Sequence, residues 1–441
     1  MKPRHRHSAR LARPAAVRAA SPPQLVQIEK PIYGGSFLAR VEGKAVFVPL
    51  ALPGEQARVT LLEEKRSFAT AEVDAIVAPA PERTSAPCPS FGPCGGCHYQ
   101  HATYEAQLGF KHAILRETLE RAGVWPPDSI DVLAGNPWAY RNRIRLVFDA
   151  AGNPGYRGRR SHAVIPIAEC PIAAPLLVSA ALRAAEFFRD SGPASRPTEL
   201  ALFCDAEETS VLASLFTGSS ARFPFKDVSA ALLRHIPSLR GVEGVEQPAG
   251  QTPRAIARSG DSSLTYRAAG FDYRVDRGAF FQVNRWLVDA LVERVTAGRA
   301  GALAWDLFAG VGLFARRLAA RFERVIAVES APAAIAALAH NLSGARADAL
   351  ESSTLGFLRR ASKQPDLIVV DPPRTGLGAE TAALLAEIAA PAVTYVSCDP
   401  ATLARDLRAL LAAGYAIDRV TLADLFPQTF HLETIVDLRR P

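Results

Sequence analysis

Hydrophobic and polar positions alternate over short stretches in the first part of the chain. Glycine and proline separate these stretches, each of which has the length of a single strand. They lie at residues 25–28, 35–41, 45–48, 57–62 and 69–73. Alternation with a period of two is typical of a strand that is buried on one side. Several short strands so close together favour a small closed barrel of the OB type, a fold that often binds single-stranded nucleic acid.

The middle of the chain combines a helix with a β-rich region. Residues 106–123 have the spacing of an amphipathic helix that ends at a glycine. A β-rich region follows at residues 131–273, with a second helix near residues 173–188. Its clearest strand, residues 140–148, carries three arginines on one face, namely Arg141, Arg143 and Arg145. This face suits contacts with phosphate groups, or else it is a solvated strand face.

From residue 276 onward, strand-like and helix-like segments alternate. The predicted strands are residues 303–308, 325–328, 367–370 and 393–396. The predicted helices lie near residues 286–296, 313–321, 331–341, 379–388 and 401–412. This alternation is the pattern of a mostly parallel sheet with helices on its faces, so we predict the α/β class. The expected domains are a disordered basic tail (1–22), the OB-like β-barrel (23–80), a central β-rich domain opened by a cysteine-rich loop (81–275) and the α/β domain (276–441).

Composition adds a compartment and a kind of partner to this outline. The chain has 441 residues, of which 49% are hydrophobic and 22% charged, as in a soluble globular protein. No apolar run reaches the roughly 18 residues that span a bilayer, and no signal peptide is evident, so we expect a cytoplasmic protein without membrane contact. The net charge of +7 favours a polyanionic partner. Lysine and arginine without any acidic residue in positions 1–20 indicate a tail that contacts nucleic acid, with an organellar transit peptide as the alternative.

The six cysteines occupy different kinds of position. Cys88, Cys94 and Cys97 stand in a loop rich in glycine and proline, and Cys170 comes from a distant segment. Four thiolates suit either a structural zinc ion or an iron–sulfur cluster, and the spacing alone does not choose between them. Unligated thiols are the remaining alternative. Cys204 has no such neighbours and is expected to pack in the core.

Two of the C-terminal strands end in residues that suit a bound nucleoside. The strand that contains Asp306 leads into Gly310 and Gly312 and then into a helix, so the backbone can approach a ligand closely. The next strand ends at Glu329, whose carboxylate can accept hydrogen bonds from ribose hydroxyls. The third glycine of a dinucleotide fingerprint is missing, which favours S-adenosylmethionine over a dinucleotide. A close-packed turn without a ligand is the alternative.

Further candidates for chemistry stand at the remaining strand ends. The strand at residues 393–396 leads to Cys398, a candidate nucleophile at the edge of the sheet. A buried, inert cysteine is the common alternative. The strand at residues 367–370 leads to Asp371, which two prolines hold in a stiff loop. Glu433 precedes the last strand, where an ordinary polar residue is the alternative.

Together these motifs resemble the RNA uracil-5 methyltransferases, in the branch that has a TRAM barrel and a cysteine-bound cluster and that modifies ribosomal RNA. The matching segments are the four cysteines of the proposed metal site, residues 280–284, the loop at Asp306, and residues 371–374, 397–400 and 431–433. The resemblance implies a C-terminal Rossmann-like class I methyltransferase domain. It also implies cofactor contacts to S-adenosylmethionine from Gln282, Phe308, Glu329 and Asp371, with Asp348 on the adenine side. Cys398 would be the nucleophile and Glu433 the base, and a 4Fe-4S cluster in preference to zinc would be bound by Cys88, Cys94, Cys97 and Cys170.

The chemistry of uracil methylation explains why these residue types are needed. Carbon 5 of uracil is a poor nucleophile until a thiolate adds to carbon 6, and the same thiolate can leave again. A base must then remove the proton from carbon 5, for which a carboxylate is suited. The target base must be unpaired or flipped out, and Phe280 is either a stacking platform for it or a core residue.

We therefore expect a monomeric enzyme that methylates carbon 5 of a uridine in 23S-type ribosomal RNA. Transfer RNA is the alternative substrate. An inactive, cluster-bearing RNA-binding or assembly factor is the alternative from another class, and the intact Cys398, Glu433 and Gln282 argue against it. The cluster is expected to be structural, because none of its ligands lies near the catalytic motifs in the sequence.

Overall fold

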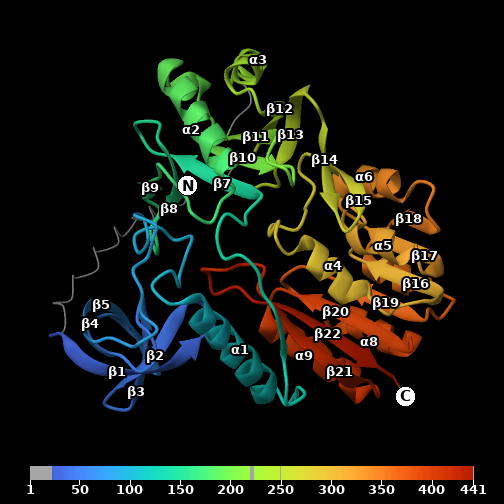
Figure 1. Ribbon diagram of the computed structural model, residues 1–441, viewed down its shortest axis with the longest axis horizontal. Coiled ribbons are helices and arrows are strands. Elements are labelled where there is room, and N and C mark those ends of the chain that lie inside the picture. Colours follow the sequence, from blue (N-terminus) through green and yellow to red (C-terminus); the bar gives the residue numbers. More distant parts are fainter. Residues whose placement is uncertain (1–21, 219–222, 249, 441) are drawn as a thin grey trace, which may run out of the picture. The chain divides into compact units, whose positions relative to one another are not determined.

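The computed structural model of the chain describes residues 22–218, 223–248 and 250–440 (Figure 1). The basic tail predicted at residues 1–22 therefore lies almost entirely outside the described residues. The described chain forms two compact units. Among the described residues, the smaller unit comprises residues 22–30 and 36–80, and the larger one comprises residues 31–35, 81–218, 223–248 and 250–440.

The smaller unit is a closed β-barrel. Within the described residues its strands follow the order β1-β2-β3-β5-β4 around the barrel. Their bounds are β1 Gln24–Ile32, β2 Ser36–Val41, β3 Lys44–Pro49, β4 Gln56–Glu64 and β5 Phe68–Ala78. Alternate side chains such as Val26, Ile28 and Val59 are buried in its interior, as the period of two requires. The barrel predicted from the alternation of hydrophobic positions is thus confirmed.

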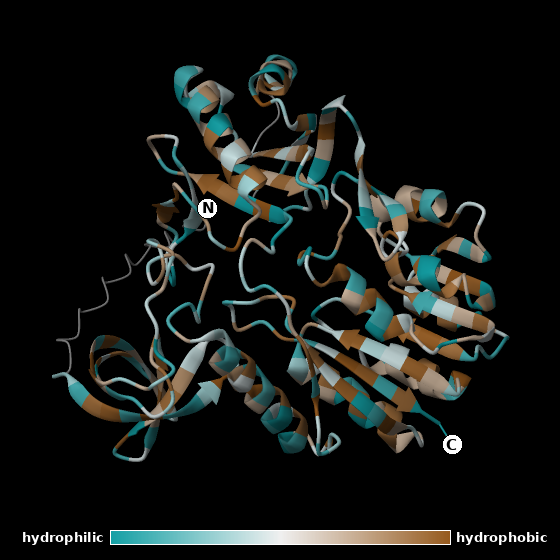
Figure 2. Cartoon of the chain, viewed as in Figure 1, coloured by the Kyte–Doolittle hydropathy of each residue, from teal (hydrophilic) through white to brown (hydrophobic). Residues whose placement is uncertain are grey.

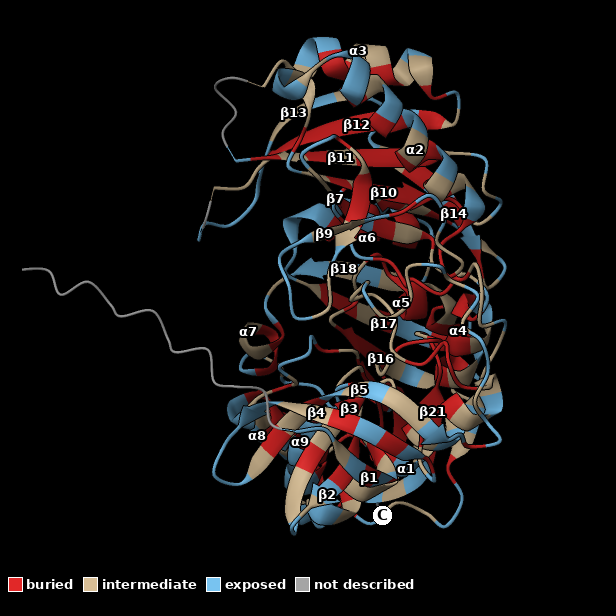
Figure 3. Ribbon diagram, turned by 90° about the vertical axis from the view of Figure 1, so that its left-hand side faces the viewer, coloured by how far each residue is buried: buried red, intermediate tan, exposed pale blue. Residues whose placement is uncertain are grey.

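The larger unit contains a central, mostly antiparallel sheet. Its strands follow the order β13-β12-β11-β10-β7-β8-β9 in the part of the chain that the structure describes. Their bounds are β7 Arg143–Phe148, β8 Pro154–Arg157, β9 Val164–Pro166, β10 Glu199–Cys204, β11 Val211–Thr217, β12 Leu239–Glu246 and β13 Arg254–Gly260. Figure 3 shows β11 and β12 as largely buried strands.

Helices cover one face of this central sheet. They are α2 (Pro175–Asp190) and α3 (Phe225–His235), with a short 3-10 turn at Pro193–Ser195. Their apolar side chains form one core with Ile144, Leu202 and Ala213. The helix α3 was not predicted. The strand with the arginines begins later than expected, so that Arg141 lies before β7 and only two of the three arginines alternate along it.

The C-terminal part of the larger unit is built on a second, mostly parallel sheet. In the described residues its order is β18-β17-β16-β19-β20-β22-β21-β6, with β22 antiparallel to both neighbours. The bounds are β6 Asp131–Leu133, β16 Gly301–Leu307, β17 Phe322–Glu329, β18 Ala347–Glu351, β19 Leu367–Val370, β20 Ala392–Ser397, β21 Ala416–Ala423 and β22 Glu433–Arg439. The strand β19 is fully buried and hydrophobic throughout, as expected for the middle of a covered parallel sheet (Figure 2).

Helices pack on both faces of this second sheet. The helices are α1 Tyr104–Arg121, α4 Val288–Thr296, α5 Leu313–Leu318, α6 Pro332–Leu342, α7 Thr354–Leu358, α8 Ala379–Ile388 and α9 Pro400–Ala412. One core combines α4, α5 and α6 with the hairpin β14 (Ser263–Ala268) and β15 (Phe271–Asp276), and the other combines α1, α7, α8 and α9. This arrangement confirms the predicted α/β class.

Two elements from before residue 276 belong to this second sheet and its layers. The strand β6 pairs with β21 at the sheet edge, and α1 packs in one core with α9. The sequence assigned both elements to the central domain, because nothing local to them shows which distant strand or helix they meet.

None of the helices in the described chain combines the length and apolar character that crossing a bilayer requires.

Candidate active site

The carboxyl ends of four neighbouring strands meet at one edge of the second sheet. Phe308 follows β16, Glu329 ends β17, Asp371 follows β19 and Cys398 comes directly after β20. Strand order runs outward in opposite directions from β16 and β19, which makes this edge the switch point where α/β sheets bind ligands. The structure thus brings these four predicted residues to the same edge.

The loop after β16 is shaped by backbone strain and by one carboxylate. Phe308 has a φ of 65°, an unusual value for a residue with a side chain, and Gly312 has a φ of 89°. Such strained residues gather at ligand sites. The Glu329 carboxylate accepts hydrogen bonds from Gly310 N at 2.8 Å and from the amides of Ser330 and Ala331 at 2.6 Å. Glu329 is therefore held against the glycine loop by these three hydrogen bonds.

Asp306 is fully buried beneath the same loop. Its Oδ2 accepts a hydrogen bond from Ala315 N at 2.8 Å, at the start of α5, while Oδ1 has no hydrogen-bond partner among the described residues. Burial raises its pKa to about 7. A buried acceptor without a partner is costly and calls for a donor from a ligand or from water. The loop therefore fits a nucleoside cofactor with donor groups.

Asp371 and Gln282 meet beside Cys398. The Gln282 amide Nε2 lies 3.4 Å from Asp371 Oδ2, and its own backbone carbonyl accepts a hydrogen bond from Asn142 Nδ2 at 2.9 Å. Burial raises the pKa of Asp371 to about 7. Gln282 and Asp371, both predicted to contact the cofactor, thus lie within hydrogen-bonding distance of each other.

Cys398 and Glu433 face one another across two antiparallel strands. Ser397 of β20 pairs with Thr434 of β22, so the next residue of one strand stands opposite the preceding residue of the other. Burial and the nearby carboxylates of Glu433 and Asp371 raise the pKa of Cys398 to about 11. Burial, followed by repulsion from Asp371, also raises the pKa of Glu433 well above its usual range.

Two residues that the sequence analysis did not assign complete this pair. Within the described chain, Arg374 is the cation that lowers the pKa of both Cys398 and Glu433. Its Nη2 lies 2.9 Å from Nδ1 of His431, and burial together with this arginine lowers the pKa of His431 to about 3. His431 is therefore neutral at physiological pH and can orient the guanidinium. Arg374 and His431 stand within residues 371–374 and 431–433, the segments that also contain Asp371 and Glu433. Their closeness to these two residues in the sequence could have marked them as part of the site.

Asp348 is not brought to this group. It lies inside β18 opposite Ile326, whereas Glu329 pairs with Glu351 at the strand end. A separation of three residues along a strand corresponds to about 10 Å. Asp348 instead forms an exposed ion pair with Arg324 at 2.7 Å. The structure therefore separates it from the four strand-end residues.

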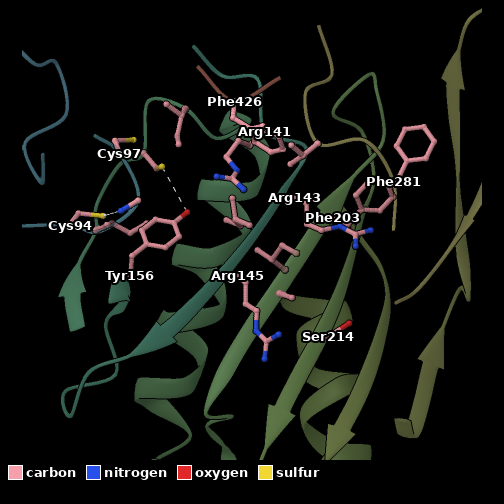
Figure 4. A pocket seen from close by; sticks show the side chains of 18 of the residues that line it. Cys94, Cys97, Arg141, Arg143, Arg145, Tyr156, Phe203, Ser214, Phe281 and Phe426 are labelled. Atoms are coloured by element: carbon pink, nitrogen blue, oxygen red, sulfur yellow. Dashed lines mark hydrogen bonds between the residues drawn. The ribbon is translucent and has the colours of Figure 1, made fainter. Parts of the chain in front are cut away.

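The cysteines predicted to bind a metal line one cavity of about 640 Å³ next to the open face of the central sheet. In Figure 4, Cys94, Cys97 and Tyr156 gather at one end, while Arg143, Phe203 and Phe281 lie towards the other. Tyr156 Oη lies 3.9 Å from Cys170 Sγ, and Gly96 N lies 3.4 Å from Cys94 Sγ. Among the described residues, no three His, Cys, Asp or Glu side chains are arranged to hold a single metal ion.

Burial is the main influence on the pKa values of these thiols. It raises the pKa of Cys97 to about 12 and also raises the pKa values of Cys88 and Cys94. The neighbouring thiols of this group, including Cys170, raise these values further. Cys170, Cys94 and Cys88 are therefore close enough to Cys97 to raise its pKa. Cys204 is buried in the core beneath α2, as predicted.

The cysteine loop also contacts the segment that leads to Glu433. Backbone amides of His98 and Tyr99 donate to the carbonyl of Gln428 at 2.8 and 3.1 Å. The Gln107 side chain on α1 binds the backbone N and the Oε1 of the same Gln428, each at 3.0 Å. The cysteine loop is thus distant from the catalytic motifs in the sequence but contacts the segment before Glu433 in space. Sequence separation says nothing about such contacts.

Phe280 lies at the rim of the cavity and is exposed. Its side chain is 64% accessible, which excludes the core-packing alternative considered from the sequence. The neighbouring Phe281 is buried against Tyr266, with ring centroids 4.4 Å apart. Adjacent phenylalanines thus have opposite environments, one in the core and one open to a partner.

Comparison with known proteins agrees with these features. The family model described as tRNA (Uracil-5-)-methyltransferase matches residues 358–441, and the TRAM domain model matches residues 23–73. An uncharacterized RNA methyltransferase of Streptomyces avermitilis is 35% identical over 94% of this chain and 97% of its own length. The 23S rRNA (uracil(1939)-C(5))-methyltransferase RlmD of Chromohalobacter salexigens is 36% identical over 94% of this chain and 89% of its own length.

A solved structure shares the fold over nearly the whole chain. It is that of the Pyrococcus abyssi tRNA (uracil-54, C5)-methyltransferase in complex with S-adenosyl-L-homocysteine. The TM-score is 0.74 at 23% identity, covering 94% of this chain and 100% of that one. The likeness in fold and the full-length relatives lead to one conclusion: this chain belongs to the RNA uracil-5 methyltransferase family.

Proposed function

We propose that the protein transfers a methyl group from S-adenosylmethionine to carbon 5 of a uridine in 23S-type ribosomal RNA. The observation that carries this proposal is the pairing of Cys398 with Glu433 at strand ends that also carry Asp371 and Glu329. Ribosomal RNA is favoured over transfer RNA because relatives at 33–36% identity over most of the chain are named 23S rRNA enzymes. We further propose a monomer in the cytoplasm, which size-exclusion chromatography and cell fractionation would test.

The thiol of Cys398 would act first, by adding to carbon 6 of the target uracil. Its raised pKa means that the thiolate is scarce before RNA binds, so the site must favour ionisation. Arg374 supplies the favourable charge, and the neutral His431 keeps the guanidinium in place. Bound S-adenosylmethionine supplies the methyl group, and Gln282, Phe308, Glu329 and Asp371 would hold it.

Glu433 would then remove the proton from carbon 5. A carboxylate with a raised pKa is a stronger base than an ordinary glutamate, and burial beside Asp371 provides that property. As the proton leaves, the electrons of the C5–H bond form the double bond between carbons 5 and 6, and the C6–S bond breaks. The Cys398 thiolate leaves with the electrons of that bond, which restores the free enzyme. The exposed ring of Phe280 would stack on a base that has left the RNA helix.

We propose that Cys88, Cys94, Cys97 and Cys170 bind a 4Fe-4S cluster with a structural role. Burial and, after it, the thiols of Cys170, Cys94 and Cys88 raise the pKa of Cys97, and a metal centre would relieve this repulsion by stabilising the thiolates. Four sulfurs on one zinc ion would stand about 3.8 Å apart, as Zn–S bonds of about 2.3 Å require. Ligands of a cluster each bind a different iron and so stand farther apart. Iron and sulfide in a brown protein would support the cluster, and a colourless zinc protein would refute it.

Mapping 5-methyluridine in RNA from cells with and without the gene tests the proposed function. Loss of one 23S site in the deletion strain, restored by the wild-type gene and not by Cys398→Ala, is the expected result. The variant Glu433→Gln should accumulate a covalent protein–RNA adduct, because the base that permits release is missing. A fully active Cys398→Ala enzyme would refute the mechanism. Loss of 5-methyluridine from transfer RNA alone would show that transfer RNA is the substrate. An absence of cofactor binding in calorimetry would indicate an inactive RNA-binding factor.

A further inference from the structure

A smaller hollow shares Gly96 and Tyr156 with the lining of the large cavity. Its volume is about 420 Å³. It is lined by Gly95, Gly96, His98, Tyr156, Arg157, Gly158, Arg159 and Arg160. Three of these side chains are arginines, and none of these described lining residues is acidic. The hollow therefore has the character of an anion site.

Backbone contacts to the cysteine loop build this hollow. Gly95 N donates to the carbonyl of Arg157 at 3.1 Å, and Arg159 N donates to the carbonyl of Pro93 at 2.9 Å. Cys94 and Gly158 form an isolated β-bridge between these two bonds. The turn after β8 that carries the arginines is thus held directly by the loop that carries the cysteines.

Gly95 lies close to the arginine turn. A Cβ at this position would lie 3.0 Å from the carbonyl oxygen of Arg157, a tight contact, and 3.5 Å from Arg159 N, an ordinary one. A side chain at this position would therefore require the Arg157 carbonyl to shift by a few tenths of an ångström.

The positive charge of the hollow is incompletely neutralised. Glu199 lies 3.5 Å from the Arg157 guanidinium, but it makes its shorter contact, at 2.5 Å, with Arg145. In the described residues the side chain of Arg160 forms no hydrogen bond or ion pair, and its backbone φ of 57° fixes an unusual turn. The lining of the hollow therefore carries positive charge that no acidic side chain of the lining offsets.

We propose that this hollow binds a phosphodiester group of the substrate RNA, separate from the methylation site. Arginines bind phosphate oxygens with paired N–H groups, and phosphate contacts position an RNA without reading its bases. RNA is the anion we favour because the chain belongs to a family of RNA methyltransferases. The inference rests on the proposed function. It also gives the cysteine loop a second task, which is to hold the arginine turn against the RNA backbone.

Salt-dependent RNA binding by the full-length protein tests this site. In Arg160→Gln, affinity for a ribosomal RNA fragment should fall on the order of tenfold at low salt, as expected when one charged hydrogen-bonding group is removed. The slope of log affinity against log salt should shrink by about 0.7 to 0.9 for each phosphate that the variant no longer neutralises. Arg157→Gln should behave alike. The rate of methyl transfer at saturating RNA should stay at the wild-type value, because neither arginine contacts a reacting atom.

Arg439→Gln is the matched control, since Arg439 is an exposed arginine paired with Asp418 on the second sheet. Unchanged affinity and slope in Arg160→Gln, or an equal loss in Arg439→Gln, would overturn the proposal. Inorganic phosphate and unlabelled RNA should also be compared as competitors at the same concentration of phosphate groups. Equal competition by the two would identify a site for free anions and would overturn the proposal. Failure of the proposed function would show itself differently, as absent methyl transfer by the wild-type protein while the binding difference persists.

Discussion

Replacing Lys111 by methionine removes one half of an ion pair that is buried on all sides. Lys111 Nζ on α1 lies 2.5 Å from Asp424 Oδ1, and both side chains are 0% exposed. The same ammonium donates to the carbonyl of Phe426 at 2.9 Å. The pair therefore joins α1 to the segment that leads into Glu433.

The expected loss in free energy of unfolding is about 3–5 kcal/mol, because Lys111→Met leaves the Asp424 carboxylate buried without a counter-charge. Methionine fills nearly the same volume as lysine, so a cavity contributes little. For a unit of this size the loss corresponds to a fall in melting temperature of about 5 °C. The double variant Lys111→Met/Asp424→Asn should recover part of this loss, since it has no buried charge.

Urea unfolding followed by circular dichroism measures these free energies for the wild type, the two single variants and the double variant. Arg439→Met is the control for an exposed pair and should cost less than about 1 kcal/mol. A loss below about 1 kcal/mol for Lys111→Met, or strictly additive losses in the double variant, would refute the account of a buried, coupled pair.

Further predictions concern the active site and the cysteines. Arg374→Gln should raise the pKa of Cys398 above about 11, because the favourable charge is removed while the carboxylates stay. The rate of iodoacetamide labelling of Cys398, measured against pH, should then have its midpoint at higher pH than in the wild type. A lower or unchanged midpoint would contradict the role of Arg374. Asp306 has its folded-state pKa raised from 3.8 to about 7, so the folded state keeps its proton longer than the unfolded state and stability falls as pH rises through that window. Asp306→Asn should remove this part of the pH dependence in urea unfolding, and an identical pH profile would contradict the assignment. Cys94→Ser should lose iron, and it should weaken RNA binding more than it slows methyl transfer on bound RNA. The control Cys204→Ser should keep its iron. A larger effect on methyl transfer than on RNA binding in Cys94→Ser would count against a structural cluster.

Local patterns in the sequence determined the strands of the barrel and the strands β16, β17, β19 and β20 of the second sheet, whereas β18 and β21 were not predicted. Alternation with a period of two located all the barrel strands, and the segment at residues 367–370 was recovered with its observed bounds. Strand-end positions also indicated Glu329, Asp371 and Cys398, since the carboxyl ends of parallel strands necessarily share an edge, whereas Phe308 was indicated by the family resemblance. These features depend on residues close together in the chain.

Contacts between distant segments were decided by the tertiary structure alone. The pairing of β6 with β21, the buried bond from Lys111 to Asp424 and the bonds from the cysteine loop to Gln428 join residues hundreds of positions apart. No periodicity records such contacts, because each side only needs a compatible surface and the partner is chosen when the whole core packs. The same reason explains why the distance of Asp348 from the strand ends could not be predicted: the register of β18 against β17 sets its position. The sequence named the reacting groups, and packing determined which other residues set their charge and position.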